Sequence, residues 1–392
     1  MWVTPYDLSR LKTPYLNDSS KRITEKGLGA CSAHLLRVGC VVMSSRAPIG
    51  YVALPTVPFC TNQGCKTIKL KDGFHSEFAY YNILFNIDKV KNLGEGTTFA
   101  EISKAALATV ALPFPTSLPE QTKIAEILST MDRAIEQTEA LIAQQQRIKT
   151  GLMQDLLTRG IDEHGNLRSE TTHTFKESPL GRIPVEWDVK TLEQLTSRIV
   201  DGVHHTPTYV ESGVPFIVIT DLTAGAGIDF SSTRFVSPKD HRDFSRRADP
   251  SPGDVLVTKD GTLGVARIVP PEAPEFSIFV SVAMLRPKQT LCFPELIWAF
   301  FESGDFLTQL GALSAGTGLA HIHLEHFRSF LVRRPHMDEQ RLIFCILNKQ
   351  ENLLNSTIAG LAKLKIQKTA LMQDLLTGKK RVTSLLEPEP AN

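Results

Sequence analysis

Two long stretches of the chain carry apolar residues at alternating four- and three-residue steps, from Ile124 to Leu156 and from Ile343 to Leu375. This spacing places the apolar residues on one narrow helical face, which is typical of a coiled-coil seam. We therefore predict two long helices that pair with each other; the alternative is two unrelated surface helices, each packed on its own domain. The predicted seam residues are Ile124, Leu128, Ile135, Ile142, Leu152, Leu156, Ile343, Leu347, Leu354, Leu361, Leu371 and Leu375.

The two stretches are also copies of each other. Residues 119–160 align with 338–379 without a gap, and both end in the phrase LMQDLLT. A repeat of this length indicates two copies of one folding unit, each a globular domain followed by a long helix. Further upstream, the matched segments are GCVVMSSRAPIGYVA (39–53) with GDVLVTKDGTLGVAR (253–267), GTTFAEIS (96–103) with GTGLAHIH (316–323), and YDL (6–8) with TDL (220–222).

The globular parts carry short β-branched runs, such as PFIVIT (215–220) and SIFVSVAML (277–285), between Gly and Pro turns. Helical patterns lie late in each domain. The expected fold class is therefore α+β, with two mixed α/β domains separated by a pair of long coiled-coil helices. The predicted organisation is a first domain at 1–116, a first helix at 117–160, a linker at 161–180, a second domain at 181–335, a second helix at 336–379 and a tail at 380–392.

The two copies differ in length before their first matched motif. The second copy has residues 181–214 ahead of its TDL match, whereas the first copy reaches YDL at residue 6. We expect either a first domain that is shortened at its N-terminus or a true start upstream of Met1. A shortened first domain would lack one polar loop and at least one strand of its sheet.

Composition and charge limit the classes of function that the chain can have. The chain is 42% hydrophobic and 22% charged, with a net charge of +1, so it does not have the strongly basic balance of a protein that holds nucleic acid alone. No apolar run approaches the roughly 18 residues that cross a bilayer, and the N-terminus lacks a signal-peptide pattern. We expect a cytoplasmic protein. The six cysteines form no CxxC pair, which favours reduced thiols over the alternative of a zinc site.

Motifs of catalysis are missing from the sequence. It has no GxxxxGK[ST] phosphate loop, no GxGxxG dinucleotide motif, no Asn- or Asp-Pro-Pro-aromatic motif and no clear nuclease carboxylate–lysine cluster. The run HIHLEH (321–326) suggests a metal, but no acidic or cysteine ligand set accompanies it. We expect neither catalytic nor metal-binding residues in this chain.

Polar loops between rigid elements are the strongest candidates for a binding function. Paired loops keep their glycines but change their exposed residues: Ser45 and Arg46 become Lys259 and Asp260. Arg and Lys suit guanine edges and phosphates, Asn and Gln suit adenine, and Ser and Thr suit either; ordinary solvated turns are the alternative. The candidate DNA-contacting residues are Ser44, Ser45, Arg46, Asn62, Gln63, Lys66, Thr97, Thr98, His204, His205, Thr206, Tyr209, Lys259, Asp260, Thr262, Thr317, His321 and His323.

Taken in order, the duplicated motifs resemble the specificity (S) subunit of type I restriction–modification enzymes. The resemblance covers nearly the whole chain. It rests on IPVEWDV, DGVHHTP, GDVLVTKDGTLG, RAPIGYVA with TNQG, LPEQ, LMQDLLTG, and the twin GT–A–I motifs, GTTFAEIS and GTGLAHIH. It implies two target-recognition domains that each read half of a split site in double-stranded DNA, and helices that pair antiparallel and fix the gap.

The same resemblance implies partners and cofactors. Two methyltransferase (M) subunits would dock on the chain and carry S-adenosylmethionine, and restriction/translocase (R) subunits using ATP and Mg²⁺ would join outside them. The chain itself would bind no cofactor. An antiparallel helix pair gives the two units a pseudo-two-fold relation. In LMQDLLT we expect Asp155 and Asp374 to serve structure and partner contact and not catalysis.

Two other functions remain open from the sequence. One is a stand-alone DNA methyltransferase or nuclease, which the missing motifs disfavour. The other is a non-catalytic coiled-coil adaptor with no nucleic-acid role, which leaves the varied loops unexplained.

Overall fold

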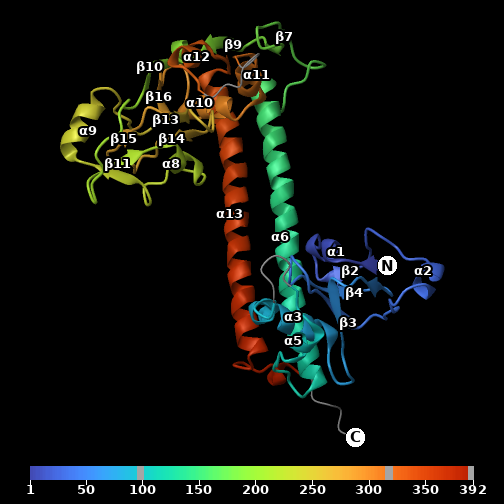
Figure 1. Ribbon diagram of the computed structural model, residues 1–392. Helices are drawn as coiled ribbons and strands as arrows, with labels where there is room; N and C mark the ends of the chain where they lie inside the picture. Colours follow the sequence, from blue (N-terminus) through green and yellow to red (C-terminus); the bar gives the residue numbers. More distant parts are fainter. Residues whose placement is uncertain (95–100, 314–320, 387–392) are drawn as a thin grey trace. The chain divides into compact units, whose positions relative to one another are not determined.

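The computed structural model describes residues 1–94, 101–313 and 321–386, and the chain divides into two compact units (Figure 1). Unit 1 comprises residues 1–143 with the chain from 356 onward, and unit 2 comprises 144–355. Each unit holds one globular domain and a segment of both long helices. Among the described residues, no helix is both long and apolar enough to cross a membrane.

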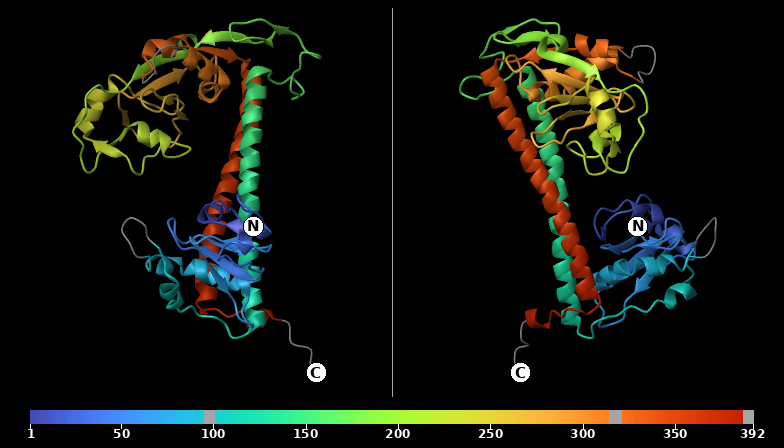
Figure 2. Two further views of the ribbon diagram at one scale, coloured as in Figure 1. Left: turned by 45° about the vertical axis from the view of Figure 1, so that its right-hand side comes forward. Right: turned by 90° about the vertical axis from the view of Figure 1, so that its left-hand side faces the viewer.

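The two long helices are α6 (Leu118–Thr158) and α13 (Met337–Leu376), which begin and end within a few residues of the predicted bounds. Within each unit, their segments lie side by side and run antiparallel (Figure 2). Equivalent ion pairs join them: Lys368 Nζ lies 2.5 Å from Asp132 in unit 1, and Lys149 Nζ lies 2.5 Å from Glu351 in unit 2. The expected α+β fold with paired long helices is confirmed.

The predicted seam agrees with the burial along both helices. Every predicted seam residue is buried or half-buried, with Leu128 and Ile343 fully buried, whereas positions between them such as Ile366 reach 71% exposure. The helices end inside the opposite copy's domain core: Met153 and Leu156 pack into unit 2, while Leu375 packs into unit 1. The phrase LMQDLLT therefore closes the core of the domain that the other copy encodes.

The start of each helix is fixed by the same Glu-Gln pair. Gln121 Nε2 donates to the carbonyls of Gly73 (3.1 Å) and Pro115 (2.8 Å), and its Oε1 accepts from His75 N (2.9 Å). In unit 2, Gln340 makes the same set of bonds to Leu291 O, Pro335 O and Phe293 N. Both glutamines are buried, so these bonds tie the helix rigidly to its own domain.

The glutamate beside each glutamine reaches the tail of the other helix. Glu120 accepts two hydrogen bonds of 2.6 Å from Arg381, which follows α13. Glu339 binds Arg168, which follows α6, and also accepts from Trp187 Nε1 (2.9 Å). The hydrogen bond from Arg381 lowers the pKa of Glu120. Each end of the helix pair is thus locked by a carboxylate–guanidinium contact.

Unit 1 is built on a four-stranded mixed sheet in the order β2-β4-β3-β6, with a small parallel pair β1-β5 beside it. β4 pairs parallel with β2 and antiparallel with β3, and α3 packs its buried face on the sheet core. The element bounds are β1 (Trp2–Val3), α1 (Pro5–Ser9), β2 (Tyr15–Leu16), α2 (Glu25–Gly29), β3 (Cys40–Ser44), β4 (Val52–Pro55), β5 (Cys60–Thr61), β6 (Cys65–Lys69), α3 (Ser76–Phe85), α4 (Ile87–Lys91), α5 (Lys104–Ala108) and, after α13, η1 (Thr383–Leu385).

Unit 2 contains an antiparallel sheet in the order β10-β16-β13-β14, a three-stranded sheet β12-β11-β15, and the pairs β17-β9 and β7-β8. The bounds are β7 (Phe175–Lys176), β8 (Ile183–Pro184), β9 (Asp188–Thr191), α7 (Leu192–Leu195), β10 (Thr196–Asp201), β11 (Val214–Ile217), α8 (Ile219–Thr223), β12 (Arg234–Val236), α9 (Pro238–Ser245), β13 (Val255–Thr258), β14 (Ala266–Ile268), β15 (Ser277–Ile278), β16 (Val282–Pro287), α10 (Pro294–Phe301), α11 (Gly304–Leu313), α12 (Leu324–Ser329) and β17 (Leu331–Arg334).

Two predicted strands are shorter than the sequence pattern suggested. In 215–220 the strand ends at Ile217, because Asp221 accepts a hydrogen bond from Val218 N (2.7 Å) and starts helix α8. The run at 277–285 is divided between two sheets, because β15 belongs to the three-stranded sheet and β16 to the four-stranded one. Continuous β-branched runs do not reveal such interruptions, since apolar residues also suit the buried turns between them.

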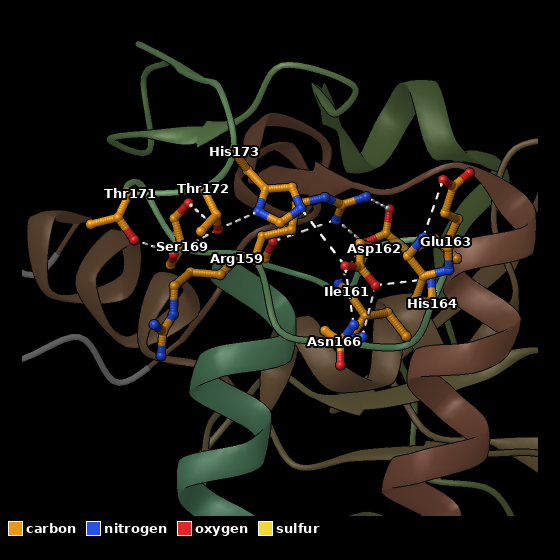
Figure 3. A network of polar contacts seen from close by, with 12 residues as sticks. Arg159, Ile161, Asp162, Glu163, His164, Asn166, Ser169, Thr171, Thr172 and His173 are labelled. Atoms are coloured by element: carbon orange, nitrogen blue, oxygen red, sulfur yellow. Dashed lines mark hydrogen bonds and ion pairs between the residues drawn. The ribbon is translucent and has the colours of Figure 1, made fainter.

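The predicted linker at 161–180 lies within unit 2 and is folded by its own polar contacts (Figure 3). Asp162 accepts from the backbone of His164 (2.9 Å) and Asn166 (2.8 Å), and Thr172 contacts the ring of His173 at 2.8 Å. Ile161 and Arg168 are buried. This segment therefore anchors the end of α6 and does more than span two domains.

Candidate nucleic-acid interface

The loop after β3 in unit 1 and the loop after β13 in unit 2 are held by the same hydroxyl contact. Ser44 Oγ donates to Pro48 O (2.8 Å) and accepts from Tyr51 N (2.9 Å). Thr258 does the same, since its Oγ1 donates to Thr262 O and accepts from Val265 N (3.0 Å). Both side chains are fully buried. Ser44 therefore shapes the loop and is removed from the candidate DNA-contacting residues, because its hydroxyl has no exposed surface.

Each loop closes at a glycine that its fold requires. Gly50 and Gly264 have φ of +98° and +80°, a region that favours glycine. A Cβ on Gly264 would lie 2.3 Å from the Phe306 ring, and one on Gly50 would lie 2.8 Å from the Lys91 side chain. The repeated glycines thus preserve both the backbone turn and its close packing on the helix behind it.

A second strand-like segment crosses each loop at the same place. Ile102 N donates to Ser45 O (2.9 Å) and Ile322 N donates to Lys259 O (2.8 Å), and both isoleucines are fully buried. The segments therefore present the residue before each isoleucine beside the loop. These are the twin GT–A–I motifs, whose Thr97, Thr98 and Thr317 lie outside the described residues.

This arrangement places one pair of exposed polar side chains at the equivalent position of each unit. In unit 1, Arg46 bridges to Glu101, with Arg46 Nε 2.9 Å from Glu101 Oε2. In unit 2, Asp260 bridges to His321 and contacts its Nδ1. The hydrogen bond from Arg46 lowers the pKa of Glu101. All four side chains keep between 31% and 46% exposure, so both pairs face solvent while the scaffold beneath them is the same.

Behind the pair, unit 2 has a buried charged network. Lys259 is 2% exposed, and its Nζ lies 3.6 Å from Asp201 Oδ2 and 3.3 Å from His321 Nε2. Asp201 in turn contacts Arg247 and His204. Burial acts to raise the pKa of Asp201, but hydrogen bonds from Arg247 and His204 outweigh it and lower that pKa. Lys259 is therefore a support for the exposed pair and not itself an exposed contact.

The remaining candidates in unit 1 have different surroundings. Gln63 is exposed, and Lys66 is half-buried with its Nζ 3.5 Å from Glu101. Asn62 accepts from Gly64 N (3.1 Å), so part of its role is to shape the loop. Ser45 is fully buried, and its hydroxyl has no hydrogen-bond partner among the described residues. Burial removes Ser45, like Ser44, from the accessible set.

In unit 2, the candidates surround the loop at 201–209. His204, His205 and Thr206 are exposed, and Tyr209 is half-buried beneath the guanidinium of Arg234 at 4.7 Å. Thr262 is exposed near Asp260, and the exposed His323 ring packs 4.5 Å from that of His321. No group of three or more His, Cys, Asp or Glu within the described part of the chain is arranged to hold a metal.

Three residues that form or support this surface are absent from the sequence-based candidates: Glu101, Asp201 and Arg247. Glu101 could have been found, because the alignment of the GT–A–I motifs places it opposite His321. Asp201 belongs to the noted DGVHHTP motif. Arg247 carries no local signal, because its partner Asp201 is distant in sequence and only the fold brings the two together.

Comparisons with known proteins agree with this architecture. The family model of the type I restriction modification DNA specificity domain matches residues 6–145. The chain is 31% identical over 254 residues to the type I restriction enzyme MjaIX specificity subunit of Methanocaldococcus jannaschii, a match that covers 63% of this chain and 56% of that relative. It is 24% identical over 313 residues to the MjaVIII specificity subunit of the same organism, covering 79% and 71%.

Solved structures share the fold. The crystal structure of a type I restriction–modification S subunit from M. genitalium has a TM-score of 0.59 at 19% identity, covering 94% of this chain and 89% of that one. A chain from a structure of type I restriction–modification complex assembly has a TM-score of 0.56 at 18% identity, covering 96% and 90%. With the duplicated loops and helices, these similarities show that residues 6–145 match the type I restriction modification DNA specificity domain, and that the chain resembles type I restriction enzyme specificity subunits over most of its length.

Proposed function

We propose that this chain reads a split sequence in double-stranded DNA, with each unit recognising one half. The observation that carries the proposal is the exposed pair of polar side chains at the equivalent position of both units, Arg46 with Glu101 and Asp260 with His321. A shared loop scaffold with different exposed residues is what two readers of different sequences require. Arg suits the acceptor edge of guanine, and a carboxylate accepts from the amino group of cytosine.

The chain acts in this proposal as a recognition subunit without a chemical step of its own. Methyltransferase subunits carrying S-adenosylmethionine, and restriction/translocase subunits using ATP and Mg²⁺, supply the chemistry. The helices α6 and α13, whose segments pair within both units, hold the two half-sites at a fixed gap. Because the net charge is only +1, partner subunits supply part of the contact with phosphates.

The proposal is tested by sequencing the methylated bases of the host genome with and without this gene. Loss of one bipartite methylated motif on deletion is the expected result, and restoration by the intact gene is the control. Unchanged methylation would contradict the proposal. Methyl transfer by the purified chain alone would instead point to a stand-alone enzyme.

A further inference from the structure

Unit 1 has an open apolar groove that the proposed DNA reading does not use. Its volume is about 500 Å³, and three lysines, Lys69, Lys71 and Lys104, lie along it. All three lysines are exposed and make no described ion pair. The apolar lining includes Ile68, Leu70, Leu107, Val110, Leu112 and Phe114.

Three structural elements that form this groove have counterparts in unit 2. β6 corresponds to β16, since Ile68 pairs with Val41 of β3 as Leu285 pairs with Val255 of β13. Residues 111–114 correspond to β17, because each stretch precedes the proline whose carbonyl accepts from the helix-start glutamine. α5 corresponds to α12, since each follows the buried isoleucine of its GT–A–I motif.

In unit 2, all three elements are covered by one continuous segment, residues 188–201. β10 pairs with β16, β9 pairs with β17, and α7 packs against α12. Leu192 and Leu195 of α7 are fully buried in the same core as Phe327 and Phe330. The segment thus supplies two strands and two leucine anchors to this side of unit 2.

Nothing among the described residues of unit 1 takes that place. β6 pairs only with β3 within the described part of the chain, which leaves its other edge free, and residues 111–114 belong to no strand. A free strand edge beside an exposed apolar surface is a typical site for the addition of a strand from another chain. The groove is therefore the empty counterpart of a site that unit 2 fills internally.

One lysine indicates the backbone chemistry of a segment that would fill the groove. Lys288 of unit 2 corresponds to Lys71, and its Nζ donates to Gln194 O (2.9 Å) at the C-terminal end of α7. Its backbone N–H donates to Leu195 O (2.8 Å). An ammonium suits the carbonyl end of a helical turn, so Lys71 is placed to receive the end of a similar turn.

We propose that the groove of unit 1 binds a partner polypeptide through a segment that resembles residues 188–201. This segment adds a strand to the free edge of β6 and inserts two leucine-sized side chains three residues apart, as Leu192 and Leu195 do. It carries an acidic residue between or beside these anchors, as Glu193 lies between the leucines of unit 2, and this charge complements the lysines along the groove. The interaction is independent of DNA reading.

The test uses the full-length chain and a fluorescent peptide with the sequence of residues 185–201, followed by fluorescence anisotropy without DNA. Saturable binding is expected, and Leu107→Asp in the groove should weaken it at least tenfold. A peptide with both leucines replaced by Asp should bind no better than the Leu107→Asp chain. Val57→Asp, at another exposed apolar residue of unit 1, is the matched control and should bind normally.

Two further measurements keep the test decisive. Lys71→Glu changes only an exposed residue along the groove, so it tests the proposal even if Leu107→Asp unfolds, and several-fold weaker binding is expected. Circular dichroism verifies the fold of each variant. No saturable binding, or equal binding by the Lys71→Glu and Val57→Asp chains, would overturn the proposal. The chain could instead bind no peptide but associate with itself, and Lys71→Glu could abolish this self-association. That result would identify a second copy as the occupant of the groove and would also overturn the proposal.

Discussion

Replacing Glu339 by Ala should destabilise unit 2 more than replacing Glu120, the matching residue of unit 1, destabilises unit 1. Glu339 and Arg168 are only 10% and 9% exposed, and the guanidinium binds both carboxylate oxygens, at 2.5 and 3.2 Å. The same carboxylate accepts from Ile161 N (2.9 Å) and from Trp187 Nε1 (2.9 Å). Alanine therefore leaves one buried cation and two buried N–H donors without their partner.

The expected loss in the free energy of unfolding follows from these unpartnered groups. Removal of one member of a buried ion pair costs about 3–5 kcal/mol, because the remaining charge stays desolvated. Glu120 is the matched case in unit 1, but its partner Arg381 is 60% exposed and can turn toward water. We therefore expect Glu120→Ala to lose only about 1–2 kcal/mol, in line with hydrogen bonds to charged groups discounted for exposure.

Urea unfolding followed by hydrogen–deuterium exchange measures the free energy of unfolding of each unit separately. Asp338→Ala is the control, since Asp338 neighbours Glu339 but is 95% exposed, and its change should stay within about 0.5 kcal/mol. The reasoning is refuted if Glu339→Ala costs no more than Glu120→Ala, or if its effect appears in unit 1.

Two further predictions concern unit 2. Gly264→Ala should lower the free energy of unfolding by about 2–4 kcal/mol, because the new Cβ would lie 2.3 Å from the Phe306 ring at a φ of +80°. Gly261→Ala is the control, since that glycine has a φ of +62° but open space around it, and it should cost only about 1 kcal/mol. Equal losses in thermal or urea unfolding would contradict this reasoning. Asp201 has a pKa below its ordinary value of 3.8. The stability that its carboxylate contributes to the folded chain is therefore complete above pH 3.8 and is lost as the pH falls through the lowered pKa. The Asp201→Asn chain should therefore melt at a lower temperature than the natural chain near neutral pH, and the two melting temperatures should converge below pH 3.8. A difference in melting temperature that stays constant with pH would argue against the Arg247 contact.

The sequence predicted the features that depend on regular spacing. The step pattern from Ile124 to Leu156 located α6, because a helical seam repeats over many turns and tolerates single polar substitutions. The matched glycines at Gly50 and Gly264 located both loops, since a positive φ leaves few alternatives. Internal repetition, more than residue propensity, carried these predictions.

Side-chain direction and distant contacts were beyond the sequence. Ser44 and Lys259 lie next to exposed loop residues, yet both are buried. Ser44 bonds back to its own loop, and Lys259 lies beside Asp201 and His321, contacts that no local sequence pattern reveals. The partners of Glu339 are distant in sequence and meet it only in the fold. For the same reason the groove of unit 1 became visible only when the covered face of unit 2 was known.

The most direct test of the central proposal changes one of the two exposed pairs at a time and determines the methylated motif of the host genome. Arg46→Gln should relax or change base choice in one half of the bipartite motif, and Asp260→Asn should do so in the other half, while the gap between the halves stays constant. Each variant serves as the control for the other. A change in both halves from either substitution, or no change from both, would contradict the assignment of one half-site to each unit.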